Sequence, residues 1–293
     1  MVAPPIESRV LANGIDHHVL TWDGNGAEGT IVLCHGFLDF AWSFAPFAEA
    51  LAGLGHRVVA FDWRGHGESS WIGAGGYYHF PDYVLDLAEL LPQVVEGPLH
   101  LLGHSMGGTA ACLYAGTRPK DVTSLCLVEG IGPPGHDPSE AVGRCDTFLR
   151  TVAAVRNGRD RILPTLDAAA ERLRAQHPRL GEEWARFLAE KGTVAATGPD
   201  GNAQGYRWRF DPLHRTTSPI TFTDAVFGGF LERICVPVLY IADREGFRPA
   251  EEGDRLARLP SHRVLEYGGK GHMIHWFAPR ELARDVSNFV RST

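Results

Sequence analysis

The sequence predicts an α/β fold with a mostly parallel sheet, helices on both faces and an inserted helical cap. Short apolar runs alternate with helical patterns, and this alternation predicts a largely parallel sheet. Several of the runs are apolar throughout, as is expected of strands buried on both faces. The alternation stops between about 132 and 229, where the patterns are helical and polar. We therefore expect a first core part at 1–131, a cap at 132–229 and a second core part at 230–293.

The first part of the core begins with a hairpin pattern. Two strand patterns within 9–22 flank Asn13-Gly14, a pair that favours a tight hairpin turn. Apolar runs after the hairpin predict strands, and the periodic segments between them predict helices. In chain order the predicted elements are a strand at 30–34, a helix at 42–53, a strand at 57–61, a helix at 80–95, a strand at 99–102, a helix that ends before Pro119 and a strand at 123–128.

The cap is predicted to contain three helices, and the alternation of strand and helix returns after it. A cluster of Gly, Pro, Asp and Asn at 198–202 predicts a turn within the cap. The predicted elements are cap helices at 141–156, 165–176 and 182–191, then a strand at 236–242, a helix at 250–258, a strand at 263–267 and a helix at 279–290. An insertion after the C-terminal end of a strand is expected to lie over the sheet edge where such folds bind ligands.

Composition and charge disfavour several classes of protein. The chain has 293 residues, of which 44% are hydrophobic, and its formal net charge of −7 argues against a nucleic-acid partner. No apolar stretch approaches the length of about 20 residues needed to span a bilayer, and the N-terminus lacks the pattern of a secretory signal. Cys34, Cys126 and Cys235 lie in or beside apolar runs, which indicates small core residues in a reducing compartment. We expect a cytoplasmic protein without membrane insertion, disulfides or a metal site, and no oligomeric state is predicted.

Residues 103–107, Gly-His-Ser-Met-Gly, have the Gly-x-Ser-x-Gly pattern between a predicted strand and a predicted helix. In this setting the pattern predicts a nucleophile elbow, a sharp and strained turn that projects the serine hydroxyl above the sheet. Only small residues fit two positions to either side of the serine, because the strand and the helix cross closely there. Gly103 and Gly107 meet that requirement, and Gly108 adds to it. Ser105 is therefore the predicted nucleophile.

Taken together, these features resemble the α/β-hydrolase family over nearly the whole chain. The motifs that carry the resemblance occur in the order and spacing of that family. They are His35-Gly36-Phe37, the segment 62–69 (Asp-Trp-Arg-Gly-His-Gly-Glu-Ser), the segment 103–108 and Gly271-His272. Two further segments, 129–134 and 208–212, resemble the serine-hydrolase-like subgroup, which includes the mesoderm-specific-transcript type. The resemblance implies the α/β-hydrolase fold.

The resemblance also implies partners for Ser105. A serine hydroxyl needs a base to take its proton, and in this family the base lies in the loop after the final strand. His272 directly follows a glycine there and is favoured, while His275 lies about one helical turn further on. The backbone N–H groups of Phe37 and Met106 are expected to form the oxyanion hole.

The acid that orients His272 has three candidates. Most relatives place an aspartate in the loop after the strand that follows the cap, but the matching position here is Gly246. Asp243 lies a few residues before that position, and Glu245 lies one residue before it. A second location in the family is the end of the strand after the nucleophile helix, where this chain has Glu129. We favour Glu129, whose additional methylene group suits the longer reach, and keep Asp243 and Glu245 as alternatives.

The expected activity is that of a serine hydrolase. It would cleave a small to medium carboxylic ester, or a thioester or amide, through an acyl-serine intermediate and without a metal or organic cofactor. The expected partner is a small ester-like molecule. Dehalogenases and epoxide hydrolases are disfavoured, because they carry an aspartate at the position of Ser105. Two alternatives stay open: a cofactor-free dioxygenase or metal-free haloperoxidase (perhydrolase) on the same fold, and a non-catalytic ligand-binding member.

Overall fold

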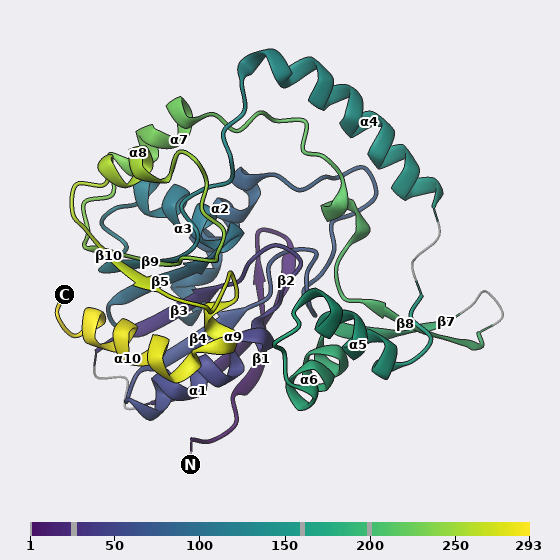
Figure 1. Cartoon of the computed structure of the whole chain (residues 1–293), viewed down its shortest axis with the longest axis horizontal. Coiled ribbons are helices and arrows are strands. Elements are labelled where there is room, and N and C mark those ends of the chain that lie inside the picture. Colours follow the sequence, from purple (N-terminus) through teal and green to yellow (C-terminus); the bar gives the residue numbers. More distant parts are fainter. Residues whose placement is uncertain (1, 25–27, 159–161, 198–200) are drawn as a thin grey trace.

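The computed structural model describes residues 2–24, 28–158, 162–197 and 201–293 (Figure 1). One sheet of eight strands lies at its centre, in the spatial order β1 (Ile6–Ala12), β2 (Ile15–Trp22), β4 (Arg57–Phe61), β3 (Thr30–Cys34), β5 (Leu99–His104), β6 (Ser124–Val128), β9 (Val238–Asp243) and β10 (His262–Tyr267). The pairs β1–β2 and β2–β4 are antiparallel, and the other neighbours in this sheet are parallel. The predicted mostly parallel sheet is confirmed.

The predicted hairpin joins β1 and β2. Asn13 and Gly14 have φ values of 49° and 70°, and a two-residue type I′ turn requires positive φ at both positions. The strand predicted at 236–242 instead begins at Val238, because Pro237 has no N–H to donate to its neighbours in the sheet. This strand extends to Asp243, which is therefore its last residue and not part of the following loop.

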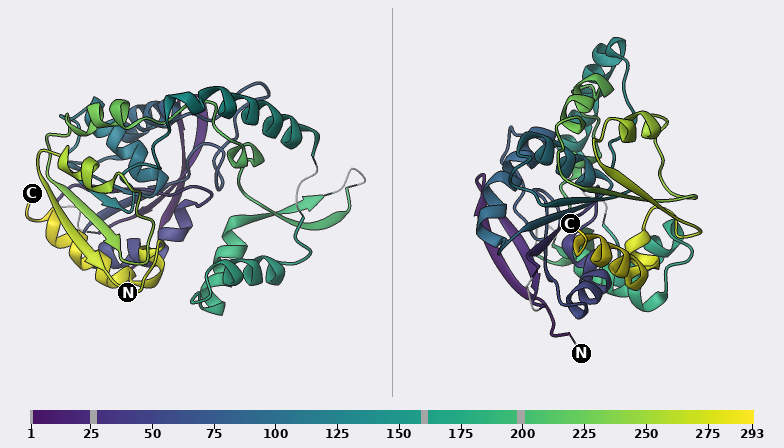
Figure 2. Two further views of the ribbon diagram at one scale, coloured as in Figure 1. Left: turned by 45° about the horizontal axis from the view of Figure 1, so that its top comes forward. Right: turned by 90° about the vertical axis from the view of Figure 1, so that its left-hand side faces the viewer.

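Alternate residues of the buried strands contribute to two hydrophobic cores, one on each face of the sheet. In β3, Val32 packs into one core, and Ile31 and Leu33 pack into the other. Helices cover both faces, as Figures 1 and 2 show. They are α2 (Phe80–Val94), α3 (Met106–Thr117), α7 (Asp224–Leu231) and α8 (Glu252–Ala257) on the first face, and α1 (Ala45–Gly53), α9 (Ile274–Phe277) and α10 (Pro279–Val290) on the second. The short helix η1 (Ala41–Phe44) precedes α1.

Most of the segment between β6 and β9 lies to the right of the sheet in Figure 1. The helices predicted there are present as α4 (Ala141–Asn157), α5 (Leu166–Gln176) and α6 (Glu182–Gly192), with the short helices η2 (Pro138–Glu140) and η3 (Pro212–Arg215). The expectation of a wholly helical insertion needs correction, because β7 (Thr193–Thr197) and β8 (Ala203–Trp208) form an antiparallel pair. Most of their residues are exposed or half-buried, so neither strand has the continuous apolar run from which strands were predicted. Residues 198–200 of the predicted turn lie outside the described residues.

Close backbone contacts at the start of α3 explain the glycines around Ser105. A Cβ atom at Gly103 would overlap the backbone of Gly108, and one at Gly107 would overlap the carbonyl group of Cys34 in β3. Main-chain atoms cannot rotate away as a side chain can, so a substitution would force the elements apart. The glycines therefore allow α3 to pack directly against β5 and β3.

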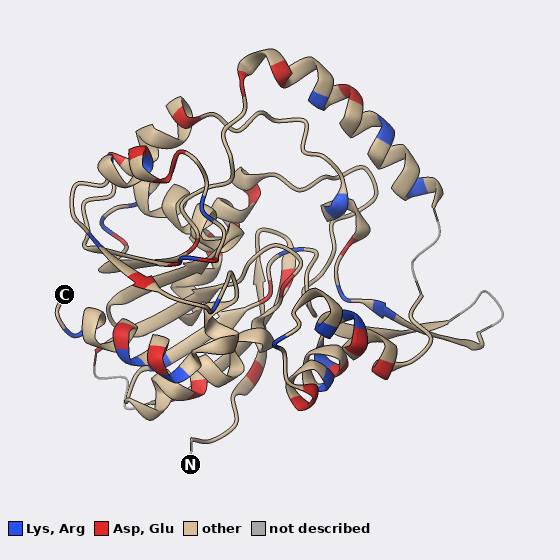
Figure 3. Cartoon of the chain, viewed as in Figure 1, with Lys and Arg blue, Asp and Glu red and all other residues tan. Residues whose placement is uncertain are grey.

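Both signs of charge occur on the outer helices. Figure 3 shows acidic and basic residues interspersed on α5, α6 and α10. Some of them pair, for example Arg186 with Asp167 across α5 and α6 at 3.2 Å. Among the described residues, no helix combines the length and the apolar character needed to cross a membrane.

We expect Gly107→Ala to destabilise the fold. The added Cβ would overlap the Cys34 carbonyl, and moving α3 away from the sheet should cost about 2 kcal/mol or more. Denaturant unfolding measures this change. Gly143→Ala is the matched control, because Gly143 lies in α4 with open space at its Cβ position, and alanine is the better helix former. Equal free energies of unfolding for the two variants would contradict the packing argument.

Candidate active site

Ser105 lies between β5 and α3 in a strained conformation. Its φ of 51° and ψ of −119° are unfavourable for any residue with a side chain. The turn is held by a hydrogen bond of 3.0 Å from the N–H of Ser105 to the carbonyl of Val128 in the neighbouring strand β6. The strand–turn–helix arrangement predicted for this serine is therefore present.

A cavity of about 840 Å³ adjoins Ser105. Its wall combines residues of the sheet edge with residues from the segment between β6 and β9. Aromatic side chains form much of this wall, and they include Tyr77, Phe80, Phe222, Phe227, Phe230 and Phe247. The volume falls within the usual range of small-molecule sites, about 300–1,000 Å³.

Glu129 directly follows β6 and points its carboxylate toward the loops after β9 and β10. Its side chain is fully buried, and its φ of 48° is uncommon for a residue other than glycine. Oε1 accepts a hydrogen bond of 2.8 Å from the N–H of Asp243, and Oε2 accepts one of 2.7 Å from the N–H of Phe247. Nδ1 of His272 donates a third hydrogen bond to Oε2, at 2.6 Å. The structure thus brings together Glu129 and His272, which lie far apart in the sequence.

Gly246 lies against the carboxylate of Glu129. A Cβ atom at position 246 would overlap Oε1 of Glu129. The space that a side chain at 246 would need is therefore filled by the carboxylate from 129. Position 246, where the resemblance places the aspartate of most relatives, and the carboxylate of Glu129 thus converge on the same point in the fold.

Asp243 and Glu245, the alternative acids, have other surroundings. The Asp243 carboxylate accepts hydrogen bonds from the N–H groups of Glu245 and Lys270, at 2.9 and 2.8 Å. Burial raises the pKa of Asp243, but these bonds and one from the N–H of Gly271 outweigh it, so the pKa lies below its usual value. The side chain of Glu245 is exposed. Neither carboxylate is a partner of the His272 ring among the described contacts.

The two backbone groups expected to form an oxyanion hole flank the same cavity. Phe37 and Met106 both line it, next to Ser105. Met106 is the first residue of α3, so its N–H has no partner within the helix. Among the described residues, the N–H of Phe37 has no hydrogen-bond acceptor either. Both N–H groups are thus available to an oxygen atom beside Ser105.

Three histidines, His79, His136 and His214, line the cavity at Ser105, whereas His35, His104 and His275 do not. Nε2 of His35 accepts a hydrogen bond of 3.0 Å from the N–H of Trp63, which joins the loops after β3 and β4. His104 contacts the carbonyl of His272 through Nε2, at 3.0 Å. His275 is buried beside Asp39, and neither His275 nor His272 is among the residues that line the cavity next to Ser105. Sequence reasoning missed Asp39 and the N–H of Phe247, because backbone donors and lone acidic residues have no distinctive local pattern.

A family model for the alpha/beta hydrolase fold matches residues 29–279 of the chain. The chain therefore belongs to the α/β-hydrolase family, and the resemblance found in its motifs is confirmed.

Relatives and solved structures agree with this assignment. A serine hydrolase-like protein of Dictyostelium discoideum is 24% identical over 289 residues, which cover 96% of this chain and 80% of that protein. A 2-hydroxy-6-oxononadienedioate/2-hydroxy-6-oxononatrienedioate hydrolase of Burkholderia vietnamiensis is 29% identical over 292 residues, or 96% of this chain and 94% of that protein. The structure of a thioesterase domain from the curacin biosynthetic pathway matches with a TM-score of 0.86 at 26% identity, over 98% of this chain and 100% of that domain. The protein is accordingly a hydrolase.

The Asp243 carboxylate accepts backbone hydrogen bonds from Glu245 and Lys270, and these bonds predict a pH-dependent loss of stability in Asp243→Asn. Because the folded-state pKa of Asp243 lies below its usual value, the ionised carboxylate stabilises the folded protein above that usual value. The stabilisation is lost as the pH falls through the folded pKa. Denaturant unfolding should therefore show wild type more stable than Asp243→Asn at pH 7, with the difference shrinking in acid. Glu245→Gln, at an exposed position, is the control; an Asp243→Asn effect that grows toward low pH would contradict the assignment.

Proposed function

We propose that this protein is a serine hydrolase that cleaves small to medium carboxylic esters through an acyl intermediate on Ser105. The observation that carries the proposal is the 2.6 Å hydrogen bond between Glu129 and His272, at the sheet edge where the strained Ser105 lines a cavity. An acid, a histidine and a serine are the groups that acyl transfer requires, and Ser105, Glu129 and His272 follow strands β5, β6 and β10 at one edge of the sheet. His272 is the proposed base and Glu129 the proposed acid.

The tautomer of His272 follows from its partner. A carboxylate can only accept, so the hydrogen bond to Glu129 requires the proton of His272 to lie on Nδ1. Nε2 then offers its lone pair to the hydroxyl of Ser105. As Oγ attacks the substrate carbonyl, its proton moves to Nε2, and the buried carboxylate of Glu129 stabilises the imidazolium that forms.

The rest of the cycle uses the same groups. The oxygen of the tetrahedral intermediate accepts hydrogen bonds from the N–H groups of Phe37 and Met106. The intermediate collapses when His272 gives its proton to the leaving alkoxide, and the alcohol departs. Water then attacks the acyl-serine while His272 takes one of its protons, and return of that proton to Ser105 releases the carboxylic acid.

The cavity wall supports an apolar substrate of moderate size. Aromatic side chains on the wall, such as Phe222 and Phe230, favour burial of an alkyl or aryl group over a strongly charged one. We propose that residues 132–229 act as a cap, since residues from this segment form part of the wall. The similarity to a thioesterase domain supports including thioesters among the substrates to be tested.

Hydrolysis of p-nitrophenyl esters of graded acyl length tests the proposal. Wild type should hydrolyse short to medium esters, and Ser105→Ala should lower kcat on the order of 10³-fold or more, because the acyl intermediate cannot form. A fluorophosphonate should label Ser105 in wild type, detected by mass spectrometry of the modified peptide. Absence of turnover on every ester and on acyl-thioesters, together with absence of labelling, would contradict the proposal.

Exchange of the acid between positions 129 and 246 tests the role of Glu129. Glu129→Gln should lower kcat by on the order of 10²–10⁴-fold, because the amide cannot stabilise the imidazolium. In Glu129→Ala the carboxylate that excludes a side chain at position 246 is absent. Adding Gly246→Asp to this variant should therefore restore at least about one tenth of the decrease in log kcat.

The control for this exchange is Glu245→Gln, which should retain the activity of wild type because the side chain is exposed. If Glu129→Gln keeps nearly full activity, the assignment of the acid is wrong. Thermal unfolding of each variant separates a loss of activity from a loss of the fold.

A further inference from the structure

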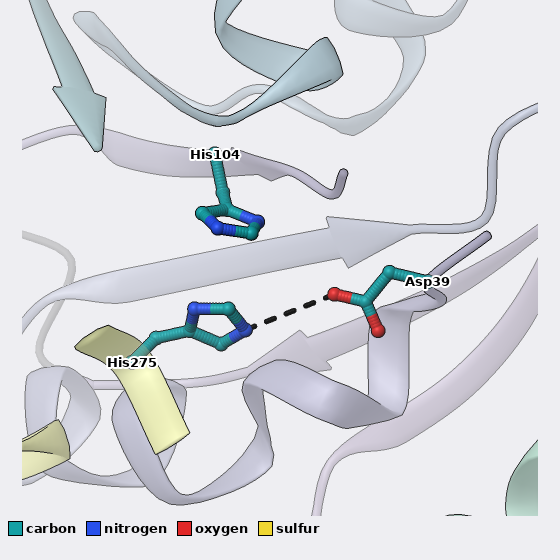
Figure 4. Close-up of side chains that lie close together, drawn as sticks. All are labelled: Asp39, His104 and His275. Carbon is teal, nitrogen blue, oxygen red and sulfur yellow. Dashed lines mark ion pairs between the residues drawn. The ribbon is translucent and has the colours of Figure 1, made fainter. Parts of the chain in front are cut away.

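Three side chains from separate parts of the chain meet behind the active site. Asp39 follows β3, His104 is the last residue of β5 and His275 lies in α9. One potential ligand atom from each lies within 4.8 Å of the others, and Figure 4 shows the His104 and His275 rings beside the Asp39 carboxylate. His104 and His275 are 2% and 1% exposed, and Asp39 is 8% exposed. The three polar groups therefore share one largely enclosed site.

The polar atoms of this cluster lack hydrogen-bond partners among the described residues. They are Oδ2 of Asp39, Nδ1 of His104 and both ring nitrogens of His275. Nε2 of His275 and Oδ2 of Asp39 are 3.7 Å apart, which is within the distance of an ion pair (Figure 4) but too long for a direct hydrogen bond. A buried polar group without a partner is costly, and several such groups aimed at one point indicate a bound species that they contact together.

The tautomer of His104 leaves one nitrogen ready to bind a cation. Nε2 of His104 lies 3.0 Å from the carbonyl of His272, and a carbonyl can only accept, so the proton is on Nε2. Nδ1 is then an unprotonated lone pair in a buried position. Metal-binding histidines commonly donate their second N–H to a carbonyl, as His104 does.

We propose that Asp39, His104 and His275 form a binding site for a divalent first-row transition metal ion, with Zn²⁺ as the ion of best fit. Two imidazole nitrogens and one carboxylate oxygen suit Zn²⁺ and leave a fourth position for water, whereas Mg²⁺ and Ca²⁺ prefer oxygen ligands alone. Tetrahedral coordination with Zn–N distances of about 2.0–2.1 Å places ligand atoms about 3.3 Å apart, so atoms that are now up to 4.8 Å apart must approach one another by up to about 1.5 Å.

One residue of this site, Asp39, also lines a second cavity. Asp39 and Trp276 line this cavity, of about 500 Å³, together with residues of α5, α6 and β8. The site is separate from the cavity at Ser105, so binding would not require passage through the proposed active site.

Metal binding would act on the loop that contains His272. His275 is three residues beyond His272 in the chain, and His104 bonds to the His272 carbonyl. An ion held by both histidines would therefore restrict this loop from two sides. The proposal concerns binding, and it does not depend on the proposed ester hydrolysis.

Titration of chelator-treated protein with Zn²⁺, followed by calorimetry and by metal analysis after dialysis, tests the site. Wild type should bind one Zn²⁺ per chain, and Asp39→Asn and His275→Gln should each weaken binding at least about tenfold. The matched control is His56→Gln, another buried histidine, whose ring contacts the hydroxyl of Ser287 in α10 and none of the three proposed ligands. A second control, His272→Gln, should keep the affinity of wild type, because His272 is not one of the ligands.

Substitution with Co²⁺ gives a readout that needs no variant. Wild type with Co²⁺ should show the visible absorption of a four-coordinate site, and X-ray absorption at the zinc edge should show two imidazole ligands. Absence of stoichiometric binding to wild type, unchanged affinity in both ligand variants, or loss of binding in His272→Gln would each overturn the proposal. If His275→Gln fails to fold, Asp39→Asn and the wild-type spectra decide the question.

Discussion

The arrangement of the site depends on the hydrogen bonds made by one carboxylate, that of Glu129. It accepts from the N–H groups of Asp243 and Phe247 and from Nδ1 of His272. These three bonds tie the end of β6 to the loops that follow β9 and β10. A buried charge is tolerated only where donors surround it, and the positive φ of Glu129 persists because the same contacts hold the residue in place.

Parallel strand pairing explains how these groups meet. β5, β6, β9 and β10 are adjacent, so their carboxyl ends share one edge of the sheet. Ser105, Glu129 and His272 each follow one of these strands. The absence of a side chain at Gly246 is also required, because the Glu129 carboxylate occupies the space that such a side chain would need. Position 246 and position 129 are therefore coupled by sterics: a side chain at one excludes the carboxylate of the other.

A second group of polar residues, Asp39, His104 and His275, lies behind this edge and is called the second layer below. His104 connects the two layers, since it precedes Ser105 in the chain and bonds to the carbonyl of His272. Asp39 and His275 face it from the loop after β3 and from α9. The loop with His272 is thus held through its side chain by Glu129 and through its backbone by His104. Changes to the second layer are expected to reach the active site through that carbonyl.

The sequence alone predicted those features that depend on the residue types within one short segment. Apolar runs identified the buried strands, paired glycines identified the close crossing at Ser105, and resemblance indicated His272. The strands β7 and β8 were not predicted, because they pair with each other and neither contains a continuous apolar run. Only the tertiary structure decided the surroundings of the three acids, since the donors that bind Glu129 and Asp243 are backbone groups identical in every residue. The cluster of Asp39, His104 and His275 could not be predicted from the sequence, because its three side chains come from distant segments that only the tertiary structure brings together.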